Sequence, residues 1–303
     1  MAKEINKIWL NHKLVSELEA KIPIMDRGFL YGDGVYETLR VYDGKIFRAD
    51  AHFKRLDDSL KGIKLKIPWP HLYLTKACLA TIRANQMKEA LIRVTVSRGS
   101  GDLGYDPASC KKPTLVIFAV PIRSGLPELW KSGIKISIVK TRRNHPVCLN
   151  PAIKSTNCLN GIFAKMESLK KGAFEGVFLN FDGYLAEGTI SNIFIIKSGI
   201  LKTPALECGI LDGVTRRTLL ETAQNSDFQV LQTHIKPFEL MEADEAFLTS
   251  TTMELMPIVQ VDEKKIGSGQ PGPVTKFLHA KFLDILRKEL KLTGKYDFYH
   301  TGR

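Results

Sequence analysis

The sequence predicts an α+β fold divided into two domains. Runs of β-branched and aromatic residues alternate with segments whose apolar residues recur at helical spacing, which is typical of mixed folds. A stretch containing glycine, proline and serine, residues 123–133, interrupts this series and is the best candidate for a linker. We therefore expect a small amino-terminal domain over residues 1–122 and a larger domain over residues 134–303.

The elements expected in the amino-terminal domain follow from local patterns. Residues 8–15 are strand-like, and residues 36–48 hold two strand-like runs joined at Asp43-Gly44, a dipeptide typical of a hairpin turn. Residues 49–63 carry apolar side chains three or four positions apart, which predicts a helix with one buried face. The remaining expected elements are a helix over 71–87 and strands over 90–98 and 113–122.

The larger domain is also predicted to be mixed, without an internal repeat. A proline-rich loop follows its first strand, and a glycine opens the helix that begins at residue 213. The expected elements are a strand over 134–140, a helix over 160–171, strands over 175–185 and 189–197, a helix over 213–224, a strand over 245–250 and a helix over 275–290.

The net charge of +12 raises the question of a nucleic-acid partner. The excess is +7 over residues 1–120 (20 basic, 13 acidic) and +5 over residues 121–303 (24 basic, 19 acidic), so it is spread along the chain. The densest basic clusters, within residues 61–66 and 140–143, are typical of solvated faces. We therefore expect no nucleic-acid partner.

Several protein classes are disfavoured by composition. The mean hydropathy is −0.08, and no run approaches the roughly 18 uninterrupted apolar residues of a membrane helix. Residues 1–15 mix charged with apolar side chains, unlike a secretory signal. The five cysteines form no CxxC pair, so we expect reduced thiols, and no histidine lies three or four residues from another, so we expect no metal site. These observations favour a cytoplasmic protein with no membrane partner.

Residues 99–104 match the dinucleotide-binding pattern GxGxxG and follow a strand-like run. A dinucleotide site requires a helix directly after the glycines, because the helix amino terminus binds the pyrophosphate. Tyr105, Asp106 and Pro107 follow instead, and a further proline at position 113 excludes a helix. We interpret this segment as a flexible loop between antiparallel strands that could cover a site.

A different set of residues indicates chemistry. Lys154 lies in a stretch low in charge, where a lysine with a lowered pKa could form a Schiff base. Glu187 stands at a strand junction, and Ser191 and Asn192 are polar residues in an otherwise apolar strand, so they require partners. A bound ligand would supply such partners.

An anion site is indicated nearby in the sequence. Val214 and Thr215 begin a helix, whose first N–H groups can bind an anion, and residues 249–252 offer four hydroxyl groups. Arg55 lies on or beside the buried face of its helix. A phosphate site, a Schiff-base lysine and a carboxylate are together what pyridoxal phosphate requires, so we expect this cofactor.

These residues resemble the class IV (fold type IV) pyridoxal-phosphate aminotransferases. That family includes the branched-chain aminotransferases, the D-amino acid aminotransferases and the aminodeoxychorismate lyases. The resemblance covers about residues 9–290, and its most specific stretch combines EGTISNIF (187–194), LKT (201–203) and LDGVTR (211–216). It implies a two-domain enzyme whose larger, cofactor-binding domain resembles an α/β barrel. It also implies a homodimer in which the loop at residues 99–107 reaches toward the neighbour's site.

The resemblance also implies a role for individual residues. Lys154 would form the Schiff base and later move the substrate proton, while Glu187 would pair with the pyridine nitrogen. The phosphate ligands implied are Arg55, Val214, Thr215 and Thr251. The residues implied around the ring are Leu211, Ser191 and Asn192. The substrate-binding residues implied are Tyr31, Tyr36, Arg40, Arg93, Tyr105 and Thr252.

The substrate is predicted by finer features of the same resemblance. Arg40, Arg93 and the loop at residues 98–107 favour the branched-chain type, which moves an amino group between leucine, isoleucine or valine and 2-oxoglutarate in amino-acid biosynthesis. Thr38 and Leu91 depart from that type. A D-amino acid aminotransferase would carry an arginine and a histidine where this chain has Leu103 and Tyr105, and an aminodeoxychorismate lyase would carry an Asn-Ser segment where it has residues 249–252. Both enzymes stay open as alternatives.

Overall fold

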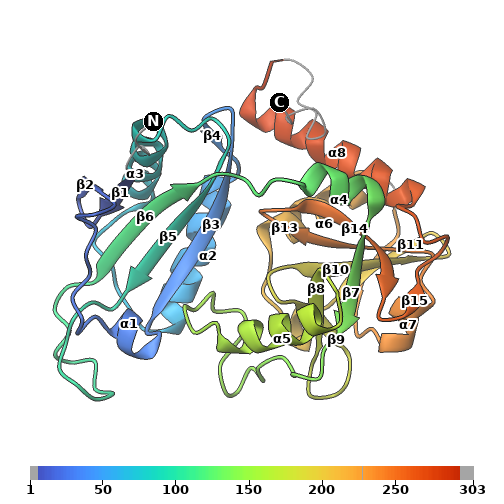
Figure 1. Cartoon of the computed structure of the whole chain (residues 1–303), viewed down its shortest axis with the longest axis horizontal. Coiled ribbons are helices and arrows are strands. Elements are labelled where there is room, and N and C mark those ends of the chain that lie inside the picture. Colours follow the sequence, from blue (N-terminus) through green and yellow to red (C-terminus); the bar gives the residue numbers. More distant parts are fainter. Residues whose placement is uncertain (1–5, 227, 294–303) are drawn as a thin grey trace. The chain divides into compact units, whose positions relative to one another are not determined.

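A computed structural model describes residues 6–226 and 228–293 of the chain (Figure 1). Residues 1–5, considered above for a secretory signal, and residues 294–303 of the expected larger domain lie outside the described residues. The chain divides into two compact units. The first comprises Met1–Ile122 with Ile153–Asn157, and the second comprises Arg123–Ala152 with Cys158–Arg303.

The first unit is built on a six-stranded antiparallel sheet with the strand order β2-β1-β6-β5-β3-β4. The strands are β1 (Lys7–Leu10), β2 (Lys13–Ser16), β3 (Gly34–Tyr42), β4 (Lys45–Ile46), β5 (Ala90–Ser97) and β6 (Thr114–Val120). The helices of this unit are α1 (Arg27–Tyr31), α2 (Ala49–Gly62) and α3 (His71–Ala84). The short helix α1 was not expected from the sequence.

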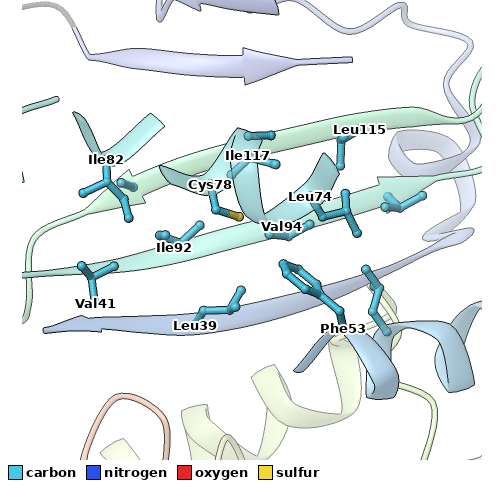
Figure 2. Close-up of a cluster of buried hydrophobic side chains, with 14 of the residues drawn as sticks. Leu39, Val41, Phe53, Leu74, Cys78, Ile82, Ile92, Val94, Leu115 and Ile117 are labelled. Carbon is cyan, nitrogen blue, oxygen red and sulfur yellow. The ribbon is translucent and has the colours of Figure 1, made fainter. Parts of the chain in front are cut away.

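The core of this unit lies between the sheet and the helices α2 and α3 (Figure 2). Alternate residues of β3, among them Leu39 and Val41, are fully buried there with Phe53 of α2 and Leu74 of α3. The period of two along a strand places the intervening residues of β3 on the opposite face of the sheet. That opposite face carries Tyr36, Arg40 and Arg93, three of the six substrate-binding residues expected from the sequence.

The second unit is built on a nine-stranded mixed sheet. Its strands are β7 (Ile134–Ile138), β8 (Glu175–Leu179), β9 (Leu185–Gly188), β10 (Asn192–Lys197), β11 (Ile200–Pro204), β12 (Val230–Thr233), β13 (Glu245–Ser250), β14 (Glu254–Val261) and β15 (Lys264–Lys265). Its helices are α4 (Leu126–Ser132), α5 (Leu159–Lys170), the 3-10 helix η1 (Leu206–Cys208), α6 (Val214–Gln224), α7 (Pro237–Met241) and α8 (Pro273–Leu290).

This larger sheet must curl on itself. The strand order β12-β11-β10-β13-β14-β7-β8-β9 places β9 five strands from β10, which is about 24 Å in a flat sheet. Only residues 189–191 join the two strands, and four Cα–Cα steps span at most about 15 Å. The Gly188 N–H also donates to the Ser191 carbonyl at 2.7 Å, which tightens this connection. A barrel-like curvature follows from the connectivity.

Two features of the domain organisation differ from the sequence-based expectation. The stretch expected as a linker, residues 123–133, contains α4 and falls within the second unit. Lys154, expected in the larger domain, falls within the first unit because its segment hydrogen-bonds along β3. The Tyr36 N–H donates to the Lys154 carbonyl, and the Thr156 N–H donates to the Gly34 carbonyl, each at 2.9 Å.

Over residues 6–226 and 228–293, none of the helices combines the length and the apolar character needed to cross a membrane. The same residues include no group of three or more His, Cys, Asp or Glu side chains that could hold a metal ion. All five cysteines are free thiols, and burial raises the pKa of Cys78 to about 12.

Candidate active site

Lys154 is positioned by backbone hydrogen bonds on both sides of its segment. Its carbonyl accepts from β3, as described above, and its N–H donates to Ser59 Oγ of α2 at 3.0 Å. The Lys154 Nζ lies 4.6 Å from the centre of the Tyr36 ring, so the ammonium lies over the aromatic face. The lysine is therefore held between β3 and α2, and the residue is only partly buried.

Arg55 is held by a buried carboxylate that the sequence analysis did not identify. Glu37, fully buried on β3, accepts hydrogen bonds from Arg55 Nε at 2.7 Å and from Arg55 Nη2 at 2.8 Å. His52 Nδ1 lies 2.8 Å from the same carboxylate. This geometry fixes the plane of the guanidinium, because both oxygens of Glu37 face it in a bidentate pair.

The protonation of this group follows from its surroundings. Burial alone would raise the pKa of Glu37, but the charge of Arg55 and the hydrogen bonds from Arg55 and His52 lower that pKa well below its ordinary value. Burial lowers the pKa of His52. Since ionised Glu37 can only accept hydrogen bonds, neutral His52 donates its Nδ1 proton to it.

The face of the sheet opposite the core carries further cationic side chains. The Arg93 guanidinium lies 3.2 Å from the centre of the Tyr36 ring, which also contacts Lys154. Arg40 lies on the same face but is only 3% exposed, and its Nη2 lies 3.7 Å from a Glu89 oxygen. Of the two expected substrate arginines, Arg93 is therefore the more accessible to a substrate carboxylate.

The loop at residues 99–107 connects antiparallel β5 and β6, as expected, and it is anchored to α1. Arg27 Nη1 donates to the Gly104 carbonyl at 2.7 Å and Arg27 Nη2 donates to the Tyr105 carbonyl at 3.2 Å. The Gly104 N–H donates to the Tyr31 hydroxyl, and the rings of Tyr31 and Tyr105 meet edge to face. The Tyr105 side chain remains 86% exposed.

In the second unit, Glu187 is the centre of a separate cluster. Its Oε1 accepts from Arg143 Nε at 2.8 Å, and its Oε2 accepts from the Leu211 N–H at 2.9 Å and from Asn192 Nδ2 at 3.3 Å. Asn192 Nδ2 also donates to the Leu211 carbonyl at 2.9 Å. The cluster orients the carboxylate and joins β9, β10 and the chain before α6.

Arg143 differs from expectation, because residues 140–143 were expected to form a solvated face, and for Arg143 this was wrong. Its side chain is only 19% exposed and is shared between Glu187 and the Asn160 side chain. A charge count along the sequence gives no signal for this pairing, because the residues lie 44 positions apart. The same is true of Glu37, which lies 18 positions from its partner Arg55.

The amino terminus of α6 is uncapped by any side chain, because Gly213 occupies the N-cap. A Cβ at Gly213 would overlap the Asn192 side chain, so only glycine allows this approach. The first-turn residues Val214 and Thr215 are buried, and their N–H groups have no partner within the helix. Arg216 does not face this terminus as an anion ligand, since it bonds to Asp212 and to two oxygens in the interior.

Two buried hydroxyl groups near this terminus lack partners. Among the described residues, Ser191 Oγ and Thr249 Oγ1 are buried with no hydrogen-bond partner. Thr249 lies directly opposite Asn192 in the pairing of β13 with β10, and the turn after it carries Thr251 and Thr252. Buried polar groups without partners are rare in proteins and indicate a missing ligand or water.

Comparison with known proteins identifies the class. Residues 34–261 match the family model for amino-transferase class IV, so the chain belongs to the class IV aminotransferases. This family uses pyridoxal phosphate, and the chain is a pyridoxal-phosphate-dependent transaminase. The expected family and cofactor are thereby confirmed.

Individual relatives cover nearly the whole chain. A putative branched-chain-amino-acid aminotransferase of Methanocaldococcus jannaschii is 41% identical over 93% of this chain and 97% of its own length. An aminodeoxychorismate lyase of Bacillus subtilis is 34% identical over 94% of each chain. The solved branched-chain aminotransferase of Escherichia coli is 30% identical, covers 93% of this chain and 95% of its own, and superimposes with a TM-score of 0.89, which confirms the expected fold.

The residues present fit the cofactor of this family. A phosphate or another anion would bind the N–H groups of the uncapped α6 terminus, where Gly213 leaves space for it. It would also supply a partner for the partnerless hydroxyls of Ser191 and Thr249. Glu187 is an oriented, buried carboxylate, as a pyridinium partner must be. Lys154 is the only one of the expected site residues with a primary amine.

Proposed function

We propose that this transaminase is a branched-chain aminotransferase, which moves the amino group of leucine, isoleucine or valine to 2-oxoglutarate in amino-acid biosynthesis. The 41% identical relative and the aromatic and cationic surface formed by Tyr36 and Arg93 support this substrate class. We further propose that the protein acts in the cytoplasm as a homodimer. The first unit, which includes residues 153–157, would then supply Lys154 and most of the substrate side, and the second unit, which includes residues 123–133, would supply Glu187 and most of the other cofactor ligands.

We propose a catalytic or binding role for each of the expected site residues. Bound pyridoxal phosphate supplies an electron sink for the bonding pair released when the substrate Cα loses its proton. Lys154 would hold the cofactor through Nζ and then carry that proton. Glu187 would keep the ring nitrogen protonated, which its bonds from Arg143 and Leu211 prepare it to do. The proposed phosphate ligands are Arg55, Val214, Thr215 and Thr251, and the proposed ring contacts are Leu211, Ser191 and Asn192.

Substrate binding is proposed for the face of the first unit's sheet that lies opposite its core, and for the turn after β13. Arg93 would pair with a substrate carboxylate, since it is only partly buried and its guanidinium lies beside the Tyr36 ring. The remaining proposed substrate residues are Tyr31, Tyr36, Arg40, Tyr105 and Thr252. Tyr105 lies on a loop whose backbone Arg27 anchors. This anchoring would hold Tyr105 in position to contact a ligand.

The test of the lysine compares Lys154→Ala with Lys61→Ala, whose side chain is exposed on α2. The purified wild-type protein with pyridoxal phosphate should show the visible absorbance of a lysine-bound cofactor. Lys154→Ala should lose that absorbance and at least about 1,000-fold of the transamination rate, because it removes both the anchor and the proton carrier. Lys61→Ala should keep both. Retention of the absorbance by Lys154→Ala would remove Lys154 from the site.

The substrate is tested by half-reactions followed at the cofactor absorbance. L-Leucine should bleach the band and release 4-methyl-2-oxopentanoate, and 2-oxoglutarate should restore it. Bleaching by D-alanine alone would instead establish a D-amino acid aminotransferase. Release of pyruvate from aminodeoxychorismate, with no response to either amino acid, would establish the lyase, the alternative that the Bacillus subtilis relative favours.

A further inference from the structure

The turn between β13 and β14 contains an unusual backbone conformation. Glu254, which begins β14 opposite Ser250, has a φ of +55°. This left-handed region strains any residue with a Cβ, and glycine or asparagine usually occupies it in a hairpin turn. Among residues 6–226 and 228–293, the other non-glycine residues with a positive φ are at least partly exposed, whereas Glu254 is 1% exposed. A buried carboxylate therefore stands where the backbone favours glycine.

A histidine of α8 binds this carboxylate. His279 Nε2 lies 2.8 Å from Glu254 Oε2, and His279 is 2% exposed. The imidazole is itself held by aromatic rings, because its centre lies 5.1 Å from that of the Trp130 ring in α4 and it stacks on Phe282 with the ring planes 13° apart. Since a buried carboxylate is costly without a polar partner, His279 and Glu254 fix each other's position.

The helix that carries His279 is anchored to the same hairpin one turn earlier. Glu245, the first residue of β13, accepts hydrogen bonds from the Val274 N–H at 2.9 Å and from the Thr275 N–H and hydroxyl at 2.7 Å. A Cβ at Gly272 would overlap the Glu245 carboxylate, so this approach requires a glycine. The helix α8 also packs against α6. The His279 ring is therefore a fixed point to which the turn is tied.

The turn carries two of the residues proposed above as ligands. Thr251, a proposed phosphate ligand, and Thr252, a proposed substrate residue, both lie between Ser250 and Glu254. Thr252 Oγ1 lies 3.0 Å from Ser250 Oγ, which accepts a hydrogen bond from the Met253 N–H at 3.1 Å. These local bonds make the turn compact, and the φ of Glu254 sets its direction from the sheet. A change at Glu254 would therefore move both threonines together.

We propose that Glu254 and His279 are positioning residues, which hold the turn at residues 250–254 in its strained form so that Thr251 can bind the cofactor phosphate and Thr252 the substrate. Backbone strain persists only where the surrounding structure enforces it, and it is common at binding sites. Glycine would adopt the same φ without strain, but it could not be held by His279. This inference rests on the proposed function and adds two residues to its site.

The test measures affinity for pyridoxal phosphate and for pyridoxal, which lacks the phosphate, by fluorescence titration of the purified protein. His279→Phe keeps an aromatic ring beside Trp130 and removes the nitrogen that binds Glu254. It should weaken pyridoxal phosphate binding by about 10- to 100-fold and pyridoxal binding by less than about threefold, because the displaced hydroxyl served the phosphate. An equal loss for both ligands would indicate a general disturbance of the fold and would overturn the proposal.

Two further variants separate positioning from stability. Glu254→Gln keeps an oxygen that can accept from His279, so affinity for pyridoxal phosphate should stay within about threefold of the wild-type value. Thr275→Val is the matched control, because it removes a buried polar contact of α8 one turn before His279. It should lower stability and leave both affinities unchanged. A loss of pyridoxal phosphate affinity in Thr275→Val as large as in His279→Phe would contradict the role of the pair.

Glu254→Gly guards against misfolding of His279→Phe. Glycine adopts a φ of +55° without strain, so this variant should fold. It should still lose about 10-fold of its affinity for pyridoxal phosphate, because the turn is no longer tied to α8. Wild-type affinity in Glu254→Gly would show that the carboxylate has no positioning role, and the proposal would fail.

Failure of this proposal is distinguishable from failure of the proposed function. Bleaching of the cofactor absorbance by L-leucine is measured on the same samples as the affinities. A wild-type protein that binds pyridoxal phosphate but is not bleached by L-leucine would contradict the proposed substrate and leave the positioning test intact. A wild-type protein that is bleached, with a His279→Phe protein of unchanged affinity, would contradict the positioning role alone.

Discussion

The two units differ in whether their functional groups already have polar partners. In the first unit, Arg55 already has its counter-charge, because Glu37 binds it through both oxygens at 2.7 and 2.8 Å. In the second unit, Ser191 Oγ and Thr249 Oγ1 are buried without partners among the described residues, and the α6 terminus has no side-chain cap. One cluster is assembled before any ligand binds, whereas the other needs a ligand to satisfy it.

The presence or absence of partners determines how each cluster contributes to stability and to ligand binding. A cation fixed by a buried carboxylate loses little entropy when a phosphate arrives, but the protein depends on the ion pair to remain folded. Unpaired hydroxyl and N–H groups cost stability in the free protein and regain it on binding. Substitutions in the first unit should therefore affect folding first, and substitutions in the second unit should affect ligand affinity first.

The largest expected effect compares Glu37→Gln with Glu187→Gln. Glu37→Gln leaves a buried arginine without its counter-charge and should lower the free energy of unfolding by about 3–5 kcal/mol. Glu187→Gln should lower it by less than about 2 kcal/mol, because Arg143 is 19% exposed and the other partners are neutral. Urea unfolding of both variants without cofactor measures the difference, and equal losses would contradict the contrast between the units.

Gly213→Ala should have the next largest effect, on cofactor affinity. The new Cβ would overlap the Asn192 side chain and displace it from Glu187 and Leu211. We expect affinity for pyridoxal phosphate to fall by about 10- to 100-fold, since the N–H groups of the α6 terminus lose their alignment.

The control for this variant is Gly161→Ala in α5. A Cβ at Gly161 makes only ordinary contact, and its backbone is helical, so affinity should not change. Fluorescence titration with pyridoxal phosphate measures both variants. An affinity for Gly213→Ala within threefold of the wild-type value would show that the close approach of Gly213 is not required.

The residues compared above also show which features could be predicted from the sequence. Periodicity predicted the helices α2, α3, α5, α6 and α8 within a few residues, because each buries one continuous face. Lys154 and Glu187 were predicted from their local context and the family resemblance. A single sequence has no local signal for the ion pairs of Glu37 and Arg143 or for the place of Lys154 in the first unit. Each of these depends on contacts between segments that are distant in the chain.

A smaller effect is expected on the pH dependence of stability. Burial lowers the pKa of His52 below its ordinary value of 6.5, so at acidic pH the unfolded chain binds a proton that the folded chain does not. Stability should therefore fall as the pH is lowered through the ordinary pKa of histidine, because the unfolded chain gains the proton first. His52→Gln should remove the part of this fall that His52 contributes. His12→Gln, at an exposed position, should leave the profile unchanged.

The smallest expected effect separates binding from folding within the second unit. Ser191→Ala removes a buried hydroxyl that has no partner among the described residues, so the free energy of unfolding without cofactor should stay constant or rise by up to about 1 kcal/mol. Affinity for pyridoxal phosphate should fall by roughly 3- to 10-fold, because the hydroxyl no longer donates to the ligand. Thr249→Val, which keeps the side-chain shape, should behave alike. A variant that loses stability and keeps its affinity would show that the hydroxyl serves the fold, and the contrast between the two units would fail at that residue.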